Sequence, residues 1–257
     1  MPTKLIVTDL DGTLLWSDKT ISDHTLSVLN RCREQGIKFA YATGRGGSAR
    51  LVAPCELFDG KITMNGAIAK VQNDVVYERL IPWQTIQPLL LACHERGIKV
   101  TSESDGFHYS NFVVSDFWSY IHNFEIVDFS THQKDAEKVY SPAISPENSA
   151  FLDSIVPKDF YSVITHDVNG MFYSIMHKEA SKSKAITALA SHWGIDMIDV
   201  AAFGDDLNDI DMLQSCGIGV AMSNAIDEVK AIADQICDTN DTDGVAKWIE
   251  ANILGAE

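Results

Sequence analysis

The chain lacks the features that mark several large classes of protein. Its 257 residues contain no apolar run near the ~20 residues that a membrane-spanning helix needs. No basic cluster or low-complexity tract occurs, and a formal net charge of −16 disfavours nucleic acid and anionic membranes as partners. Neither G-x-S-x-G nor a P-loop is present, which argues against serine hydrolases and P-loop nucleotide hydrolases.

Cysteine is also scarce. The 5 cysteines are odd in number and include no C-x-x-C pair, a pattern typical of reduced thiols rather than disulfides. The chain enters its first predicted strand without a cationic and apolar leader, so we expect no signal peptide. These features predict a cytoplasmic protein, and they leave its oligomeric state unknown.

The most informative segment that is present is an apolar strand ending in two carboxylates. The run Leu5 to Thr8 predicts a buried strand, and Asp9, Asp11 and Gly12 follow it. Open α/β sheets place their ligands at the carboxyl ends of strands. An Asx-type turn closing the strand is the alternative, but it accounts for one aspartate and the glycine, not for the second aspartate.

Strands and helices alternate in the first and last parts of the chain. Residues 23–35 and 182–193 have helical periodicity, whereas 37–42, 200–203 and 217–221 are short apolar strands. This alternation predicts an α/β fold with a parallel sheet. The middle, 82–177, carries most of the aromatic residues and three close prolines (Pro142, Pro146 and Pro157), which predicts an inserted α+β domain.

Four segments bring chemically useful residues to predicted strand ends or to the start of a helix. They are Asp9 with Asp11, Thr43 to Arg45, Lys182, and Gly204 to Asp209. Parallel strands end at one edge of a sheet, so the acidic ends should meet and form a site for a hard cation. Oxygen ligands without nearby His or Cys favour Mg²⁺ over Zn²⁺. A hydroxyl, a backbone amide, a lysine and a bound cation would together hold a phosphate group.

These motifs also carry a family resemblance. The order DLDGTLL, ATGR, NGA, K-x-x-A-I, GDDLNDIDM and DGVA resembles the haloacid dehalogenase superfamily, and within it the Cof-type capped sugar phosphatases. The resemblance implies a Rossmann-like catalytic core, 1–81 and 178–257, and an α/β cap, 82–177, that selects the substrate. It further implies a Mg²⁺-dependent phosphatase that hydrolyses small phosphomonoester metabolites, sugar phosphates above all, through an aspartyl-phosphate intermediate.

The resemblance assigns roles by position. It implies that Asp9 is the nucleophile, that Asp11 is the general acid/base, and that Lys182 neutralises the phosphate and the nucleophile. The implied phosphate-binding residues are Thr43, Gly44, Arg45 and Asn208. The implied metal ligands are Asp9, the carbonyl of Asp11, and Asp205, with Asp209 behind them to orient Lys182 or a metal-bound water. As a general acid, Asp11 needs a pKa raised toward neutrality.

The sequence allows more than one interpretation of several features. Ser183 stands where many relatives have glycine, so Lys184 competes with Lys182, although Ala185-Ile186 favours Lys182. Residues 44–49 fit G-x-G-x-x-A but lack the acidic residue of a dinucleotide site, and 239–250 nearly fit a calcium loop. His108 either packs in a hairpin or contacts substrate. A phosphomutase or phosphotransferase on the same core, and a non-catalytic phospho-ligand sensor, are the rival functions.

Overall fold

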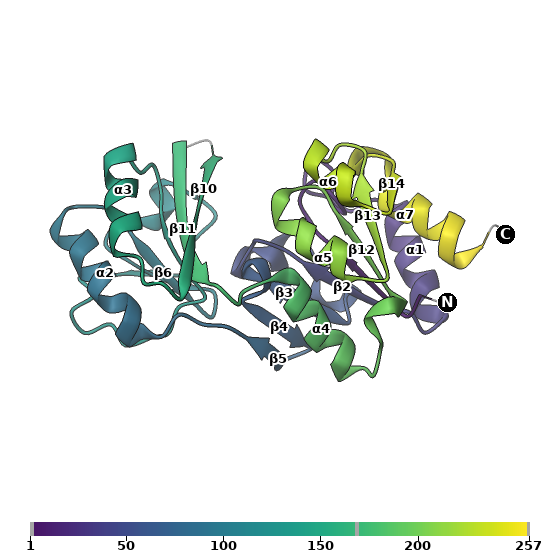
Figure 1. Ribbon diagram of the computed structural model, residues 1–257, viewed down its shortest axis with the longest axis horizontal. Helices are drawn as coiled ribbons and strands as arrows, with labels where there is room; N and C mark the ends of the chain where they lie inside the picture. The colour runs from purple at the N-terminus through teal and green to yellow at the C-terminus, as the bar shows by residue number, and fades with distance from the viewer. Residues whose placement is uncertain (1–2, 168–169, 256–257) are drawn as a thin grey trace. The chain divides into compact units, whose positions relative to one another are not determined.

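The structure is a computed structural model that describes residues 3–167 and 170–255. The chain divides into two compact units (Figure 1). The core unit comprises Met1–Glu78 and Ala180–Glu257, and the insert unit comprises Arg79–Glu179. The predicted insertion, 82–177, lies within the insert unit, and its role in selecting a substrate stays a prediction.

The core unit is built around an eight-stranded sheet. Its central strand, β1 (Leu5–Thr8), is buried throughout and pairs in parallel with β2 (Lys38–Ala42) and β12 (Val200–Gly204). The remaining strands extend the sheet in the order β14-β13-β12-β1-β2-β3-β4-β5, and they are β3 (Gly60–Thr63), β4 (Ile68–Val71), β5 (Asp74–Glu78), β13 (Ile218–Met222) and β14 (Gln235–Cys237). Among the described residues of this sheet, β4 pairs antiparallel with both β3 and β5, and the other pairs are parallel, so the predicted parallel-sheet core is confirmed.

Serine side chains cap two helices of the core unit. The hydroxyl of Ser22 accepts the amide of Thr25 at 3.0 Å at the start of α1 (Asp23–Glu34). Ser181 has the same place at the start of α4 (Lys182–His192). The other helices of this unit are α5 (Ile210–Ser215), α6 (Asp227–Ile232) and α7 (Gly244–Ile249). Within the described residues, no helix has the length and apolar character that crossing a membrane requires.

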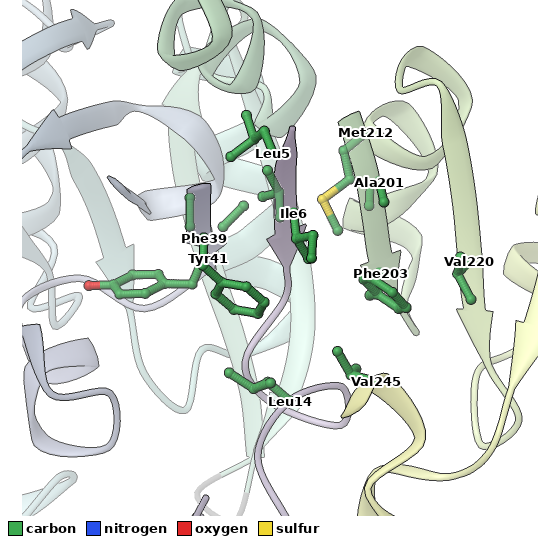
Figure 2. Packing of buried hydrophobic residues seen from close by; sticks show 14 of the residues in the cluster. Leu5, Ile6, Leu14, Phe39, Tyr41, Ala201, Phe203, Met212, Val220 and Val245 are labelled. Carbon is green, nitrogen blue, oxygen red and sulfur yellow. The ribbon is translucent and has the colours of Figure 1, made fainter. Parts of the chain in front are cut away.

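Apolar side chains pack around β1 and fix its position (Figure 2). Ile6 is inaccessible to solvent, and Phe39 of β2 and Phe203 of β12 are at most 3% exposed. Burial of apolar surface contributes about 25 cal/mol per Å², so these contacts hold the three central strands firmly against one another. The residues that follow the strands therefore start from well-defined positions.

The insert unit has a six-stranded sheet in the order β10-β11-β9-β6-β7-β8. Its strands are β6 (Thr101–Ser104), β7 (Phe107–Ser110), β8 (Phe124–Ile126), β9 (Lys138–Ser141), β10 (Phe160–Asp167) and β11 (Gly170–His177). Apolar residues of α2 (Trp83–Glu95) and α3 (Pro146–Ile155) pack with Val139, Tyr173 and Ile175 of this sheet. The predicted α+β insertion is thus confirmed as a fold.

Candidate active site

The candidate site lies at the edge of the core sheet where three neighbouring strands end. Asp9 follows β1, Thr43 follows β2, and Asp205 follows β12. The backbone amide of Asp9 donates to the carbonyl of Phe203 at 2.9 Å, which continues the pairing of β1 with β12 past the end of β1. The parallel arrangement therefore places the acidic residues of two motifs, distant in sequence, beside each other.

Lys182 joins two of these acidic residues. Its side chain is fully buried, and Nζ lies 2.6 Å from Oδ1 of Asp9 and 2.6 Å from Oδ1 of Asp209. Burial opposes the charge on Lys182, but Asp209 and Asp9 outweigh it and hold the pKa of the ammonium above its ordinary value. The lysine is thus a fixed cation between two carboxylates.

Asp9 stands in an environment that does not fully neutralise it. The residue is 6% exposed, and burial raises the pKa of its carboxyl to about 8 despite Lys182, with Asp209 and Asp205 adding repulsion. One ammonium therefore faces three nearby carboxylates. The excess negative charge favours a further cation at this place.

Asp205 is held against the loop that follows β1. The hydroxyl of Thr13 donates to Oδ1 of Asp205 at 2.6 Å. Gly12 has a φ of +80°, and a Cβ at that position would lie 2.4 Å from Oδ2 of Asp205, so the close approach requires glycine. Burial, more than the neighbouring carboxylates Asp209 and Asp206, raises the pKa of Asp205 to about 6.

Asp209 uses both of its carboxylate oxygens for contacts within the protein. Oδ2 accepts the backbone amides of Asp205 and Asp206 at 2.9 and 3.0 Å, while Oδ1 accepts Lys182. These contacts fix the loop after β12 and the lysine at once. Asp209 is therefore placed to orient Lys182 and the loop of Asp205, and the role that the resemblance implies for it stays a prediction.

The carboxylates of Asp9, Asp205 and Asp209 form a group that fits a hard divalent cation. One oxygen from each lies within 4.8 Å of the others, and the donors are all oxygen. Such a donor set suits Mg²⁺. This group shares Asp9 and Asp205 with the predicted ligands and adds Asp209. The third predicted ligand, the backbone carbonyl of Asp11, stays a prediction.

Asp11 is paired with two cations. Arg45 donates through Nε to Oδ2 at 2.5 Å and through Nη2 to Oδ1 at 2.7 Å, and Nζ of Lys19 lies 2.8 Å from Oδ1. Burial alone would raise the pKa of Asp11, but these hydrogen bonds and charges outweigh it and lower the pKa. The expectation of a raised Asp11 pKa is therefore wrong for this arrangement. Arg45, predicted to bind phosphate, here binds Asp11.

The remaining predicted phosphate ligands lie around a residue to which the sequence assigned no role. Oδ1 of Asn65 accepts Nδ2 of Asn208 at 2.9 Å, and the backbone amide of Asn65 donates to the carbonyl of Thr43 at 3.0 Å. A Cβ on Gly44 would lie 3.0 Å from the same Oδ1. Asn65 thus joins Thr43, Gly44 and Asn208. The signal available in the sequence was Asn-Gly after a strand, since Asn tolerates the left-handed φ of +52° found here.

The structure also places the residues and segments for which the sequence allows two interpretations. Lys184 is exposed, whereas Lys182 is buried among the acidic residues. A short 3₁₀ turn, Gly47–Leu51, follows Gly44 to Gly46, in place of the long helix of a dinucleotide site. Oδ1 of Asp243 accepts Trp16 and Ser22, which makes residues 239–243 a turn before α7. His108 is buried in the insert unit, 2.9 Å from the hydroxyl of Tyr140.

Comparison with known proteins gives the family. The sequence model of the family of haloacid dehalogenase-like hydrolases matches residues 6–249 of the chain. The chain belongs to this family. The match covers both segments of the core unit and the whole insert unit, so the predicted resemblance is confirmed.

Relatives in this family resemble the chain over nearly its whole length. YxeH of Bacillus subtilis (strain 168) is 30% identical over 268 residues, covering 98% of each chain. YitU of the same organism, a 5-amino-6-(5-phospho-D-ribitylamino)uracil phosphatase, is 29% identical over 96% of each chain. The solved structure of the subclass IIB sugar phosphatase BT4131 has a TM-score of 0.77 and 29% identity, covering 96% of this chain and 98% of that one.

Proposed function

We propose that the protein is a Mg²⁺-dependent phosphatase that hydrolyses small phosphomonoesters through an aspartyl-phosphate intermediate. The observation that carries this proposal is the buried Asp9–Lys182–Asp209 arrangement, with 2.6 Å contacts, beside Asp205. A nucleophile, a fixed cation and an oxygen-rich metal site then lie together at one edge of the sheet. The family supports hydrolysis, and YitU and BT4131 support phosphate esters as substrates.

In the proposed reaction, an oxygen of Asp9 forms a bond to phosphorus while the bond from phosphorus to the leaving oxygen breaks. Lys182 holds Asp9 in place and favours its charged form, which is the nucleophilic one. Water then attacks the phosphorus, the bond from phosphorus to Asp9 breaks, and inorganic phosphate leaves. This route divides one difficult displacement into two easier steps.

The proposed phosphate site combines protein donors with the cation. Thr43, the Gly44 amide and Asn208 would bind phosphoryl oxygens. Asp9 and Asp205 would hold Mg²⁺, whose charge offsets the repulsion between these carboxylates and an anionic substrate. Asp209, with both oxygens engaged, would keep Lys182 and the Asp205 loop in position.

Asp11 is the proposed general acid/base. It would give a proton to the leaving oxygen in the first step and take one from water in the second. Arg45 and Lys19 favour the charged carboxylate, which suits the second step. The first step requires that Asp11 gain a proton, and so that these contacts loosen when substrate binds.

The substrate class we propose is a phosphorylated sugar or polyol. The name of YitU specifies a phosphoribityl group and that of BT4131 a sugar, and both describe phosphate on a polyhydroxylated compound. The insert unit is the proposed source of selectivity, because the residues of the core site recognise phosphate and metal rather than the rest of a substrate.

A hydrolysis screen tests the proposal. Purified protein is assayed for phosphate release from sugar phosphates, polyol phosphates and nucleotides, with Mg²⁺ and with a chelator. We expect turnover of sugar or polyol phosphates that requires Mg²⁺. Phosphate transfer to a second sugar hydroxyl in excess of release to water would favour the phosphotransferase. Tight binding of a phosphoester without turnover would favour the sensor.

A further inference from the structure

A carboxylate from α5 holds the first turn of α4. Oδ2 of Asp211 accepts the hydroxyl of Ser181 and the backbone amide of Ser183, the latter at 3.3 Å. Ser181 caps α4, and Ser183 is the second residue of that helix. Asp211 therefore contacts the residues on both sides of Lys182.

The same short segment holds the far end of the lysine. Asp209 ends the turn η6 (Leu207–Asp209) and binds Nζ of Lys182 at 2.6 Å, while Asp211 lies in the first turn of α5. One segment thus fixes both the backbone and the ammonium of Lys182. A long side chain held at both ends has few conformations left, so its charge stays in one place.

Two hydroxyl groups complete the contact. Oγ of Ser181 lies 2.9 Å from Oγ of Ser183 and accepts the amide of Lys184 at 3.3 Å. The hydroxyl of Ser183 thus adds a polar contact beside the cap, while Asp211 itself binds the backbone amide of Ser183.

The contact is made at a cost in stability. Oδ1 of Asp211 is buried and has no hydrogen-bond partner among the described residues. A buried acceptor left without a partner destabilises the folded state. An acidic residue placed at such a cost, beside a lysine of the candidate site, favours a functional role over a stabilising one.

We propose that Asp211 is a positioning residue for Lys182. Its carboxylate fixes the first turn of α4, so that the ammonium stays between Asp9 and Asp209. Asp211 has no proposed contact with reacting atoms and acts through Ser181 and Ser183. The inference rests on the proposed function for the part that Lys182 plays in phosphoryl transfer.

The test compares three variants in the full chain. Asp211→Ala removes the contact, whereas Asp211→Asn keeps an oxygen that can accept from Ser181 and Ser183. Gln214→Ala, at an exposed residue of the same helix, is the control. Misplacement of a reacting group by about 1 Å can cost on the order of 10²-fold in rate. We expect Asp211→Ala to lower kcat about 10-fold. Its KM should change less than about twofold, since the proposed phosphate ligands Thr43 and Asn208 are intact. Asp211→Asn should restore most of kcat.

A double variant tests the route through Ser181. If Asp211 acts through that hydroxyl, Ser181→Ala and Asp211→Ala together should lower kcat no further than the larger single effect. Additive losses, or an Asp211→Asn variant as slow as Asp211→Ala, would overturn the proposal.

Amide hydrogen exchange separates this inference from the proposed function. Asp211→Ala should speed exchange at the amides of Ser183 and Lys184, and Gln214→Ala should not. If the wild-type protein hydrolyses no phosphoester, the proposed function fails, but exchange still decides whether Asp211 fixes the helix start. Unchanged exchange in Asp211→Ala would refute the positioning role whatever the activity.

Discussion

Arg45 holds both carboxylate oxygens of Asp11, at 2.5 Å from Oδ2 and 2.7 Å from Oδ1. A two-point contact of this kind fixes the plane of the carboxylate, and Lys19 adds a third contact at 2.8 Å. Asp11 therefore starts as an ordered anion. To donate a proton as proposed, Asp11 must first gain one, although Arg45 and Lys19 favour its charged form.

Replacing Asp11 with asparagine should slow hydrolysis without removing the nucleophile. The loss of proton transfer corresponds to roughly 10²–10⁴ in rate. The loss should shrink for substrates with an acidic phenol as leaving group, because such a group needs no proton. Steady-state rates over a series of leaving groups measure this dependence, and equal losses for acidic and basic leaving groups would contradict the assignment.

Asp9→Asn is the matched comparison for that variant. It removes the attacking carboxylate, so essentially no turnover should remain with any leaving group. If Asp11 also activates the water, ³²P label from substrate should accumulate on Asp9 in Asp11→Asn. Acid quench and peptide mapping locate the label, and label on a serine or a histidine would exclude Asp9 as the nucleophile.

Metal dependence can be tested at two adjacent aspartates. Asp205 belongs to the group of three carboxylates, whereas exposed Asp206 caps η6 through a 2.7 Å contact with the Leu207 amide. We expect a chelator to abolish activity. Asp205→Asn should raise the Mg²⁺ concentration needed for half-maximal rate at least 10-fold. Asp206→Asn should leave that concentration nearly unchanged. Equal Mg²⁺ responses in the two variants would count against Asp205 as a ligand.

The strand ends of this site follow from the sequence, since apolar runs followed by Asp9, Thr43 and Asp205 suffice to predict one sheet edge. The contacts among the loops cannot be predicted in this way. Asn65 and Asn208, or Asp11 and Arg45, meet because of how distant segments pack, and no local pattern encodes that pairing. The pKa of Asp11 is mispredicted for the same reason. The sequence alone does not show that Arg45 and Lys19 lie beside this carboxylate.

The insert unit shows a different limit. Strand β6 buries Thr101, Ser102 and Glu103, so the alternation of apolar and polar residues that marks a half-exposed strand is missing there. Helix α3 was predictable in part, because Ser145 followed by Pro146 and Glu147 is a helix-start signal.

His108 should make the insert unit sensitive to mild acid. Burial, with a smaller contribution from Lys138, lowers the pKa of His108 to about 4, although the Glu103 carboxylate lies 3.7 Å from Nδ1. The unfolded chain has a His pKa of about 6.5 and so binds more protons between these values. Stability is therefore lost as pH falls from about 6.5 to 4, by up to about 3 kcal/mol from this group.

Urea unfolding at pH 7.5 and 5 measures that loss. His108→Gln should reduce the difference in unfolding free energy between the two pH values, and His122→Gln, at an exposed residue, should not. The same pH dependence in His108→Gln as in the wild type would assign the acid sensitivity to other groups.

Gly66 should prove indispensable for the placement of Lys182. It has a φ of +92°, and a Cβ there would lie 2.2 Å from the carbonyl carbon and oxygen of Ser181 and 2.7 Å from the amide nitrogen of Lys182. Gly36 has a φ of +77° with nothing within 4 Å of such a Cβ. Alanine at either position carries backbone strain of about 1–2 kcal/mol, but at Gly66 it must also displace the start of α4. We expect Gly36→Ala to lower the unfolding free energy by about 1–2 kcal/mol and to leave kcat unchanged. Gly66→Ala should lower kcat by more than about 10-fold at a temperature where the variant is fully folded. Similar kcat values for the two folded variants would show that the position of Lys182 does not depend on this contact.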